Sequence, residues 1–282
     1  MTITSSTASI HQLRTQPIDR ARPHGSILGA AIASEWSKLR SVRSTVWGLL
    51  ATFGMTVGFG LLFTSAYVGR YDRLSLNQRL TFDPTAQSLR GLFLSALAIG
   101  VLGVLVTSSE YATGTIRATL AAVPQRQSVL TAKAVTFGAV ALAVALVSSF
   151  AAFFAGQAVL AGKHIGVSIT DPHVLRAVIG AAFYLAASGL LGLALGAILR
   201  STASAISTLV SLLFVLFLLA QALPDPWNSD VGKFLPGRAG AALFTVRPDS
   251  SLLSPGTALI VLIAWLVAAY ALAAVFLARR DA

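Results

Sequence analysis

Long runs of apolar residues alternate with short polar segments along most of the chain. A helix that crosses the hydrocarbon core of a bilayer needs roughly 20 apolar residues. Runs of about this length cover residues 47–68, 91–108, 134–160, 177–199, 203–223 and 257–277, and none of them contains Asp, Glu, Lys, Arg or His. The pattern therefore predicts an all-α integral membrane protein with six transmembrane helices.

Two features of these runs bear on how the helices pack. The spans before and after Arg200-Ser201-Thr202 are joined by this short turn alone, so they must be antiparallel neighbours. Glycines four residues apart, at 54 and 58 and at 192 and 196, would let helix backbones approach closely. Glycine is also common in membrane helices in general, so either pair could be incidental.

The segment before the first span divides into two parts. Residues 1–25 are polar, rich in Ser, Thr and Pro, and lack the apolar core of a signal peptide, so we expect a disordered cytoplasmic tail. Residues 26–46 carry apolar side chains at spacings of three or four, which predicts an amphipathic helix at the inner membrane interface. These side chains are Leu28, Ile32, Trp36, Leu39, Val42 and Val46. Glu35 interrupts their face and could pair with Lys38, and an ordinary basic juxtamembrane segment is the alternative.

The composition supports the membrane assignment. Of 282 residues, 55% are hydrophobic and 11% are charged, whereas about 25% are charged in soluble domains. We attribute the net charge of +11 to lipid contacts and topology, and without aromatic-interleaved basic patches we expect no nucleic-acid partner. The cluster Lys38, Arg40 and Arg43 before the first span favours a multi-pass protein with both termini cytoplasmic.

The sequence offers no catalytic, cofactor or metal site. Cysteine is absent, and no ionisable residue lies in the predicted spans, which weighs against an ion-coupled transporter. The segment 156–163 has five residues between its glycines where a phosphate-binding loop has four, and His164 replaces the Ser or Thr that would hold magnesium. Any ATP and magnesium must then be bound by a partner chain.

The polar connection after the second span has its own helical pattern. Ile116, Leu120 and Val123 share one face, Thr115 is a plausible N-cap, and Pro124 ends the pattern. A break at Thr113-Gly114 separates this part from the preceding residues. Such a helix could lie on lipid or fill a groove on a soluble partner.

The long connection 224–256 contains a half-apolar piece, residues 234–244, that is too short to span a membrane. It could dip into the outer leaflet and return, or it could form an ordinary loop helix. Its composition does not separate these alternatives.

Three stretches identify a family resemblance: SEWSKLRSVRSTVW at 34–47, SEYATGTIRATL at 109–120 and LGAILRSTASAI at 195–206. In this order on six spans, they resemble the permease subunits of bacterial type-2 ATP-binding-cassette (ABC) exporters. The resemblance extends over essentially the whole chain from about Ser26.

The resemblance implies a role for each of these segments. The interfacial helix would carry Glu35, Trp36, Lys38, Leu39, Arg40 and Arg43. The connection after the second span would be a cytoplasmic coupling helix that contacts the ATPase subunit through Glu110, Thr113, Gly114, Thr115, Ile116, Arg117, Leu120 and Pro124. The segment 234–244 would re-enter the membrane.

The resemblance also implies an assembly and an activity. Two ABC ATPase subunits and a second permease, identical or paralogous, would complete a plasma-membrane exporter, in which this chain is not itself an enzyme. The uncharged spans favour an amphipathic or hydrophobic substrate. The alternatives are a stand-alone ion-coupled secondary transporter and a non-transporting membrane anchor for an ATPase.

Overall fold

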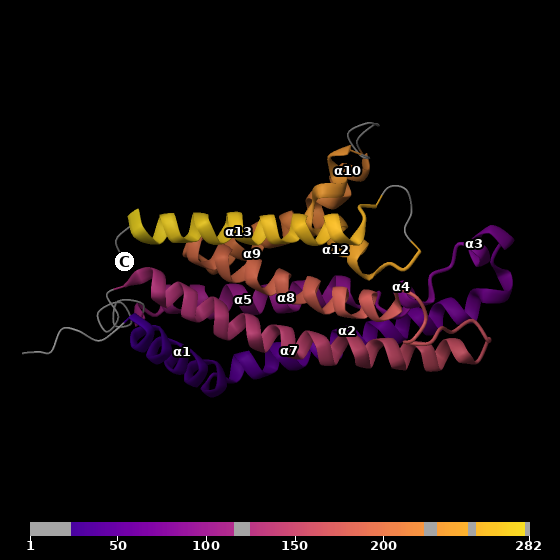
Figure 1. The fold of residues 1–282 in the computed structure, drawn as a ribbon, viewed down its shortest axis with the longest axis horizontal. Coiled ribbons are helices and arrows are strands. Elements are labelled where there is room, and N and C mark those ends of the chain that lie inside the picture. The colour runs from indigo at the N-terminus through magenta and orange to yellow at the C-terminus, as the bar shows by residue number, and fades with distance from the viewer. Residues whose placement is uncertain (1–23, 116–124, 223–229, 248–251, 280–282) are drawn as a thin grey trace, which may run out of the picture.

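The computed structural model describes residues 24–115, 125–222, 230–247 and 252–279. Helices within these ranges form an elongated bundle (Figure 1). The helical segments long and apolar enough to cross a membrane are Arg43–Arg73, Leu92–Ala112, Arg126–Ala161, Val174–Leu199, Thr202–Ala220 and Pro255–Arg279. The prediction of an all-α membrane protein with six spans is confirmed.

The helices extend beyond the predicted spans. Helix α7 (Arg126–Ala161) has 36 residues and is therefore about 54 Å long, well over the thickness of the hydrocarbon core. It includes Lys133, just as α5 (Leu92–Ala112) includes Glu110 and α8 (Val174–Leu199) includes Arg176. The predicted spans contain no ionisable residue, but these helices extend past them into charged residues.

Helix α1 (His24–Ser41) precedes the bundle and is inclined to it (Figure 1). The predicted interfacial helix ran to residue 46, but Val42 adopts an extended conformation and α2 (Arg43–Arg70) begins at the next residue. α1 packs on α7 and lies at the same end of the bundle as the C-terminal end of α13 (Pro255–Arg279). We call this the α1 end, and the opposite one the α3 end, after the short helix α3 (Leu76–Leu80).

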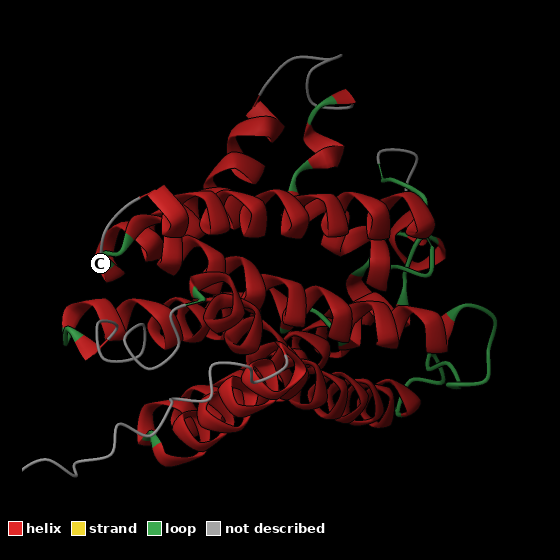
Figure 2. Cartoon of the chain, turned by 60° about the vertical axis from the view of Figure 1, so that its left-hand side comes forward, coloured by secondary structure: helices red, strands yellow, loops and turns green. Residues whose placement is uncertain are grey.

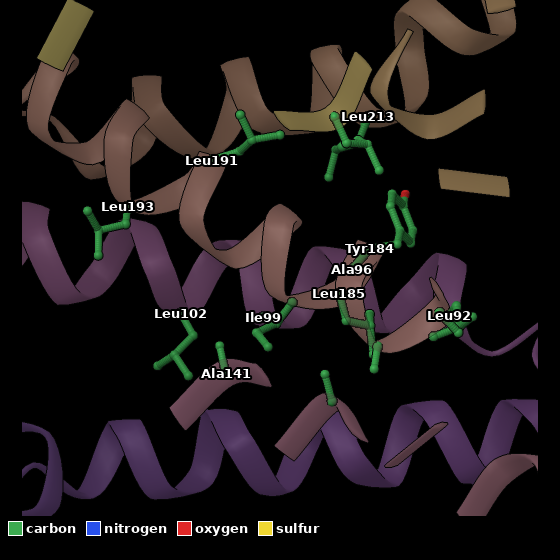
Figure 3. Packing of buried hydrophobic residues seen from close by; sticks show 14 of the residues in the cluster. Leu92, Ala96, Ile99, Leu102, Ala141, Tyr184, Leu185, Leu191, Leu193 and Leu213 are labelled. Carbon is green, nitrogen blue, oxygen red and sulfur yellow. The ribbon is translucent and has the colours of Figure 1, made fainter. Parts of the chain in front are cut away.

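The core is centred on α8, which packs against α5, α7 and α13. Its buried side chains join one cluster with residues of all three helices. Figure 3 shows part of this cluster, in which Ile99 and Leu102 of α5, Ala141 of α7 and Leu185 of α8 fill the space between the helices. Figure 2 shows the same bundle from a second direction, with helices joined by loops and turns.

Glycines set the distance between α5 and α8. A methyl group added at Gly192 would overlap the carbonyl oxygen of Gly100, and one at Gly103 would overlap that of Gly189. A methyl group at Gly196 would lie 2.9 Å from the Val104 carbonyl oxygen, closer than real side chains approach. The pair at 192 and 196 therefore permits the close helix contact that the sequence suggested. Added methyl groups at Gly54 and Gly58 would meet nothing within 4 Å, so that pair is incidental in this chain.

The fifth span is not a straight helix. It consists of α9 (Thr202–Val210), a π-helical turn (Ser211–Val215) and α10 (Leu216–Ala222). After the π turn, α10 leaves the bundle and points to the side (Figure 1). A π turn changes the direction in which a helix presents its side chains, and here it marks the point of departure.

The chain then returns into the bundle through a 3-10 turn (Gly232–Phe234) and α12 (Pro236–Phe244). Trp265 of α13 donates a hydrogen bond from Nε1 to the Phe234 carbonyl oxygen, 3.0 Å away. Trp265 lies ten residues, or about 15 Å, along α13 from its first residue Pro255. Phe234 therefore lies beside the middle of α13. The contacts place this segment within the bundle, and membrane re-entry stays a prediction.

Charged side chains hold the end of α12 in place at the α3 end. Arg176 donates to the carbonyl oxygens of Leu243 and Thr245, both at 3.0 Å, and so satisfies groups that the end of α12 leaves free. Asp83 accepts from the backbone N–H groups of Val246 and Arg247 at 2.7 and 2.9 Å. The same carboxylate caps α4 (Pro84–Ser88), so the two connections at this end are fastened together.

The close contact between α5 and α8 yields a stability prediction. Replacing Gly192 with Ala forces the two backbones apart, and overpacking of this kind costs about 1–3 kcal/mol, equivalent to a Tm lowered by roughly 3–10 °C. The matched control is Gly58→Ala on α2, where open space surrounds the added methyl group. Thermal unfolding of the purified proteins in one detergent measures both, and an unchanged Tm for Gly192→Ala would contradict the packing described here.

Candidate coupling site

Four charged side chains meet at the α1 end of the bundle. Lys133 Nζ of α7 lies 2.7 Å from Glu35 Oε2 of α1 and 3.0 Å from Glu110 Oε1 of α5. Lys38 Nζ of α1 lies 2.7 Å from Glu35 Oε1 and 2.9 Å from Glu110 Oε1. These residues, here called the ion cluster, join three helices that are distant in sequence.

The ion cluster is largely removed from solvent. The side chains of Glu35 and Lys133 are each 4% exposed and that of Glu110 is 11% exposed, whereas that of Lys38 is 37% exposed. Two carboxylates and two ammonium groups balance, so the buried volume carries no net charge. Such groups are tolerated in a low dielectric only when each has partners. Burial alone would lower the pKa of Lys38, but its hydrogen bonds to Glu35 and Glu110 outweigh burial and raise that pKa.

The cluster explains the irregular face of α1. The sequence predicted an apolar stripe through Trp36, Leu39 and Val42 that is interrupted by Glu35. The structure buries Leu39 and Glu35 against the bundle, while Trp36 is 51% exposed and Val42 is 46% exposed. Glu35 thus belongs to the buried face because Lys133 meets it there, and Trp36 lies on the exposed face. Arg40 and Arg43 are exposed on the surface.

The residues expected in the coupling helix fall into two groups. Ile116, Arg117, Leu120 and Pro124 lie outside the described residues, so their contact with an ATPase stays a prediction. Glu110 is buried in the last turn of α5 and faces α1 and α7. Its side chain is therefore engaged within this chain.

The end of α5 matches the predicted break. Thr113 closes the helix with a hydrogen bond from its hydroxyl to the Ser109 carbonyl oxygen at 2.9 Å. Gly114 follows with a φ of +71°, a left-handed conformation that favours glycine. Thr115 lies within hydrogen-bond distance of Thr113, 2.9 Å between hydroxyl oxygens. The connection therefore leaves α5 three residues after the ion cluster.

Other contacts tie the same region to the rest of the bundle. Arg126, in the first turn of α7, donates to the carbonyl oxygen of Leu277 near the end of α13 at 3.0 Å. Ser108 of α5 and Thr202 of α9 share a hydrogen bond of 2.8 Å. The two helix ends that flank the connection thus contact α1, α9 and α13.

Sequence reasoning missed Lys133 as a site residue. The predicted span begins at residue 134, directly after Lys133, whereas Lys133 lies in the third turn of α7. The available signal was the carboxylate of Glu35 on an otherwise apolar face, which required a partner beyond the nearby Lys38. Within the described ranges, no three His, Asp or Glu side chains are grouped so that they could hold a metal ion.

The burial of the ion cluster yields a stability prediction. Lys133→Met leaves two buried carboxylates with one lysine, a change that costs about 3–5 kcal/mol. The double variant Lys133→Met/Glu35→Gln restores the charge balance and should recover part of this loss. The control is Lys163→Met, whose partner Asp72 is 75% exposed, because an exposed ion pair contributes little to stability. Denaturant unfolding in detergent measures the free energy of unfolding of each variant. Equal losses of this free energy for Lys133→Met and Lys163→Met would refute a buried cluster.

Comparison with known proteins agrees with this architecture. The chain matches the family described as ABC-2 family transporter protein over residues 32–282. Comparison with curated proteins found no match. The matched range includes α1 from its middle onward and every described membrane span. A chain with six apolar spans that matches the family over most of its length is a membrane permease component of an ABC transporter, a class that associates with an ABC ATPase. The protein belongs to the ABC-2 transporter family.

Proposed function

We propose that this chain is the permease subunit of an ATP-driven exporter. A separate ABC ATPase binds the connection between α5 and α7 and drives the movement of the permease. The observation that supports this most directly is the ion cluster. It lies three residues before the connection and ties both flanking helices to α1. A pull on the connection would therefore act on three helices at once.

The structure is suited to pass such a movement into the bundle. α5 is held against α8 by glycine contacts that leave no space between the backbones. Packed helices of this kind shift as rigid elements between discrete arrangements. ATP binding to the partner can favour one arrangement only if the docked ATPase binds the two arrangements with different affinity. Two ATPase subunits, which hold the ATP and magnesium, would drive this step.

The orientation and the cargo follow from this proposal. The α1 end is the cytoplasmic end, both termini are cytoplasmic, and the protein lies in a bacterial plasma membrane. The direction is export, and the uncharged middle of the spans favours an amphipathic or hydrophobic cargo. The charged residues Glu110, Lys133 and Arg176 lie near helix ends, where they have partners within the chain. They therefore do not support the alternative of an ion-coupled carrier, which needs an ionisable group near mid-membrane.

The docking proposal is tested by substitution in the connection. Leu120→Asp places a charge on the expected apolar face and should reduce capture of the ABC ATPase that copurifies with the wild-type chain by at least about tenfold, a loss of 1.4 kcal/mol. Transport should fall with it while membrane insertion is retained. The control is Leu76→Asp on α3, a residue 73% exposed at the opposite end. Normal ATPase capture by Leu120→Asp would overturn the docking role.

A second permease would cover the fifth span. The exposed face of α9 and the π turn carries hydroxyl side chains at helical spacing: Ser204, Ser207, Thr208 and Ser211. Hydroxyl groups gain little from contact with acyl chains, but they serve well in helix–helix contacts or beside a polar path. Beyond them, Leu218 and Leu219 of the projecting α10 are 63% and 57% exposed. We propose that a second permease packs here and that the transport path runs between the two.

The absence of cysteine makes this interface accessible to cross-linking. Ser207→Cys should form a disulfide-linked permease dimer in membranes after mild oxidation, or a cross-link to a paralogous permease that carries a matching cysteine. Val147→Cys on α7, at a residue 62% exposed, is the control and should stay monomeric. Dimers from Val147→Cys, with none from Ser207→Cys in either format, would place the interface elsewhere.

A further inference from the structure

A cavity of about 480 Å³ opens beside the ion cluster. It lies between α1, the beginning of α2, the second half of α5 and α7, and its volume is in the range of sites for small organic ligands. It is distinct from the face of α9 assigned to a second permease, and its lining includes Glu110, Thr113 and Thr115, which are among the residues expected to contact an ATPase.

The lining of the cavity changes in character along α5. Leu102, Leu105 and Val106 form its apolar part, and Ser109 and Thr113 line the other end. From Leu102 to Thr113 the helix rises about 16 Å. An occupant that follows this gradient has an apolar tail toward the middle of the membrane and a polar head at its surface.

All four side chains of the ion cluster line the cavity and their charges balance, but the most exposed of them is that of Lys38. Both oxygens of Glu35 are engaged by lysines, and the second carboxylate oxygen of Glu110 is buried without a hydrogen-bond partner. Lys38 lines the cavity, uses two of its three N–H groups in the ion cluster, and keeps its side chain 37% exposed. The accessible charged group is thus an ammonium with a donor to spare.

The beginning of α2 adds to this preference. Ser44 in its first turn lines the cavity, and Val42 before it provides no side-chain cap. The first N–H groups of a long helix carry a partial positive charge and attract anions. Hydroxyl donors of Ser44 and Ser109 lie in the same lining.

From this arrangement we propose that the cavity binds an anionic phospholipid of the adjoining leaflet. Its phosphate contacts Lys38 and the first turn of α2, and the beginning of an acyl chain lies along Leu105 and Val106. A bound lipid at this position touches α1, α2 and α5 together, directly beside the ion cluster. It stabilises the arrangement in which these helices are closed on one another.

Binding is measured on the purified permease alone, so the outcome is independent of the docking and transport proposals. The probe is fluorescent phosphatidylglycerol in a neutral detergent, with saturation followed by anisotropy. Val42→Trp fills the mouth of the cavity without changing a charge, and Lys38→Gln removes the accessible ammonium. Each should raise the Kd about tenfold, and gel filtration verifies that both variants are folded.

Two matched controls separate the cavity from the general surface. Val46→Trp changes a residue 47% exposed, close to the 46% of Val42, but outside the cavity lining. Arg40→Gln removes an exposed basic residue of α1 that also lies outside it. Both should bind the lipid as the wild type does.

The remaining outcomes decide against the proposal. Undiminished binding by folded Val42→Trp, or an equal loss in all four variants, would show surface adsorption in place of a site. Inorganic phosphate competes only for the contacts of the lipid headgroup, and it should fail to displace the lipid at millimolar concentration. Full displacement of the lipid by phosphate would show that the site binds anions alone. It would overturn the proposal that an amphiphile binds there.

Discussion

The organisation of the α1 end depends on one interaction, the buried contact among Glu35, Lys38, Glu110 and Lys133. Charges so poorly exposed are stable only while all of them stay together, because separating one leaves a partner unpaired in a medium that solvates it badly. The contact therefore fixes α1 against α5 and α7 and selects which face of α1 is buried. The exposed face carries Trp36, and the cavity beside Lys38 lies within the same junction.

Beyond this junction, close contacts continue through the rest of the bundle. Glycine contacts hold α5 against α8, and α8 in turn packs against α13 and α12. At the α3 end, Asp83 and Arg176 fasten the end of α12 and the residues that follow it. Among the described residues, packed helices therefore connect the end of α5 to the opposite side, and this suits a subunit driven from one end.

Much of this could be predicted from the sequence, and the failures have physical causes. Hydropathy located six spans, since length and apolar composition determine them. It missed parts of some helices, such as residues 126–133 of α7 and 109–112 of α5, because the pairing of Lys133 and Glu110 is a tertiary contact that no local pattern shows. Both glycine pairs had the same spacing, and only the neighbours of Gly192 distinguish it from Gly58. The position of α12 beside α13 depends on Trp265 and the departure of α10, which composition does not encode. The residues expected to contact an ATPase lie largely outside the described ranges.

The central claim is that the ion cluster transmits movement from the α5–α7 connection to α1. Since the chain has no cysteine, spin labels can be attached at Trp36 on α1 and Leu272 on α13, both exposed, in the assembled transporter. Pulsed electron paramagnetic resonance then gives their separation with and without a non-hydrolysable ATP analogue. We predict a nucleotide-dependent change in distance that is lost in Lys133→Met while the ATPase stays bound. The same change in Lys133→Met, or none in the wild type, would contradict it.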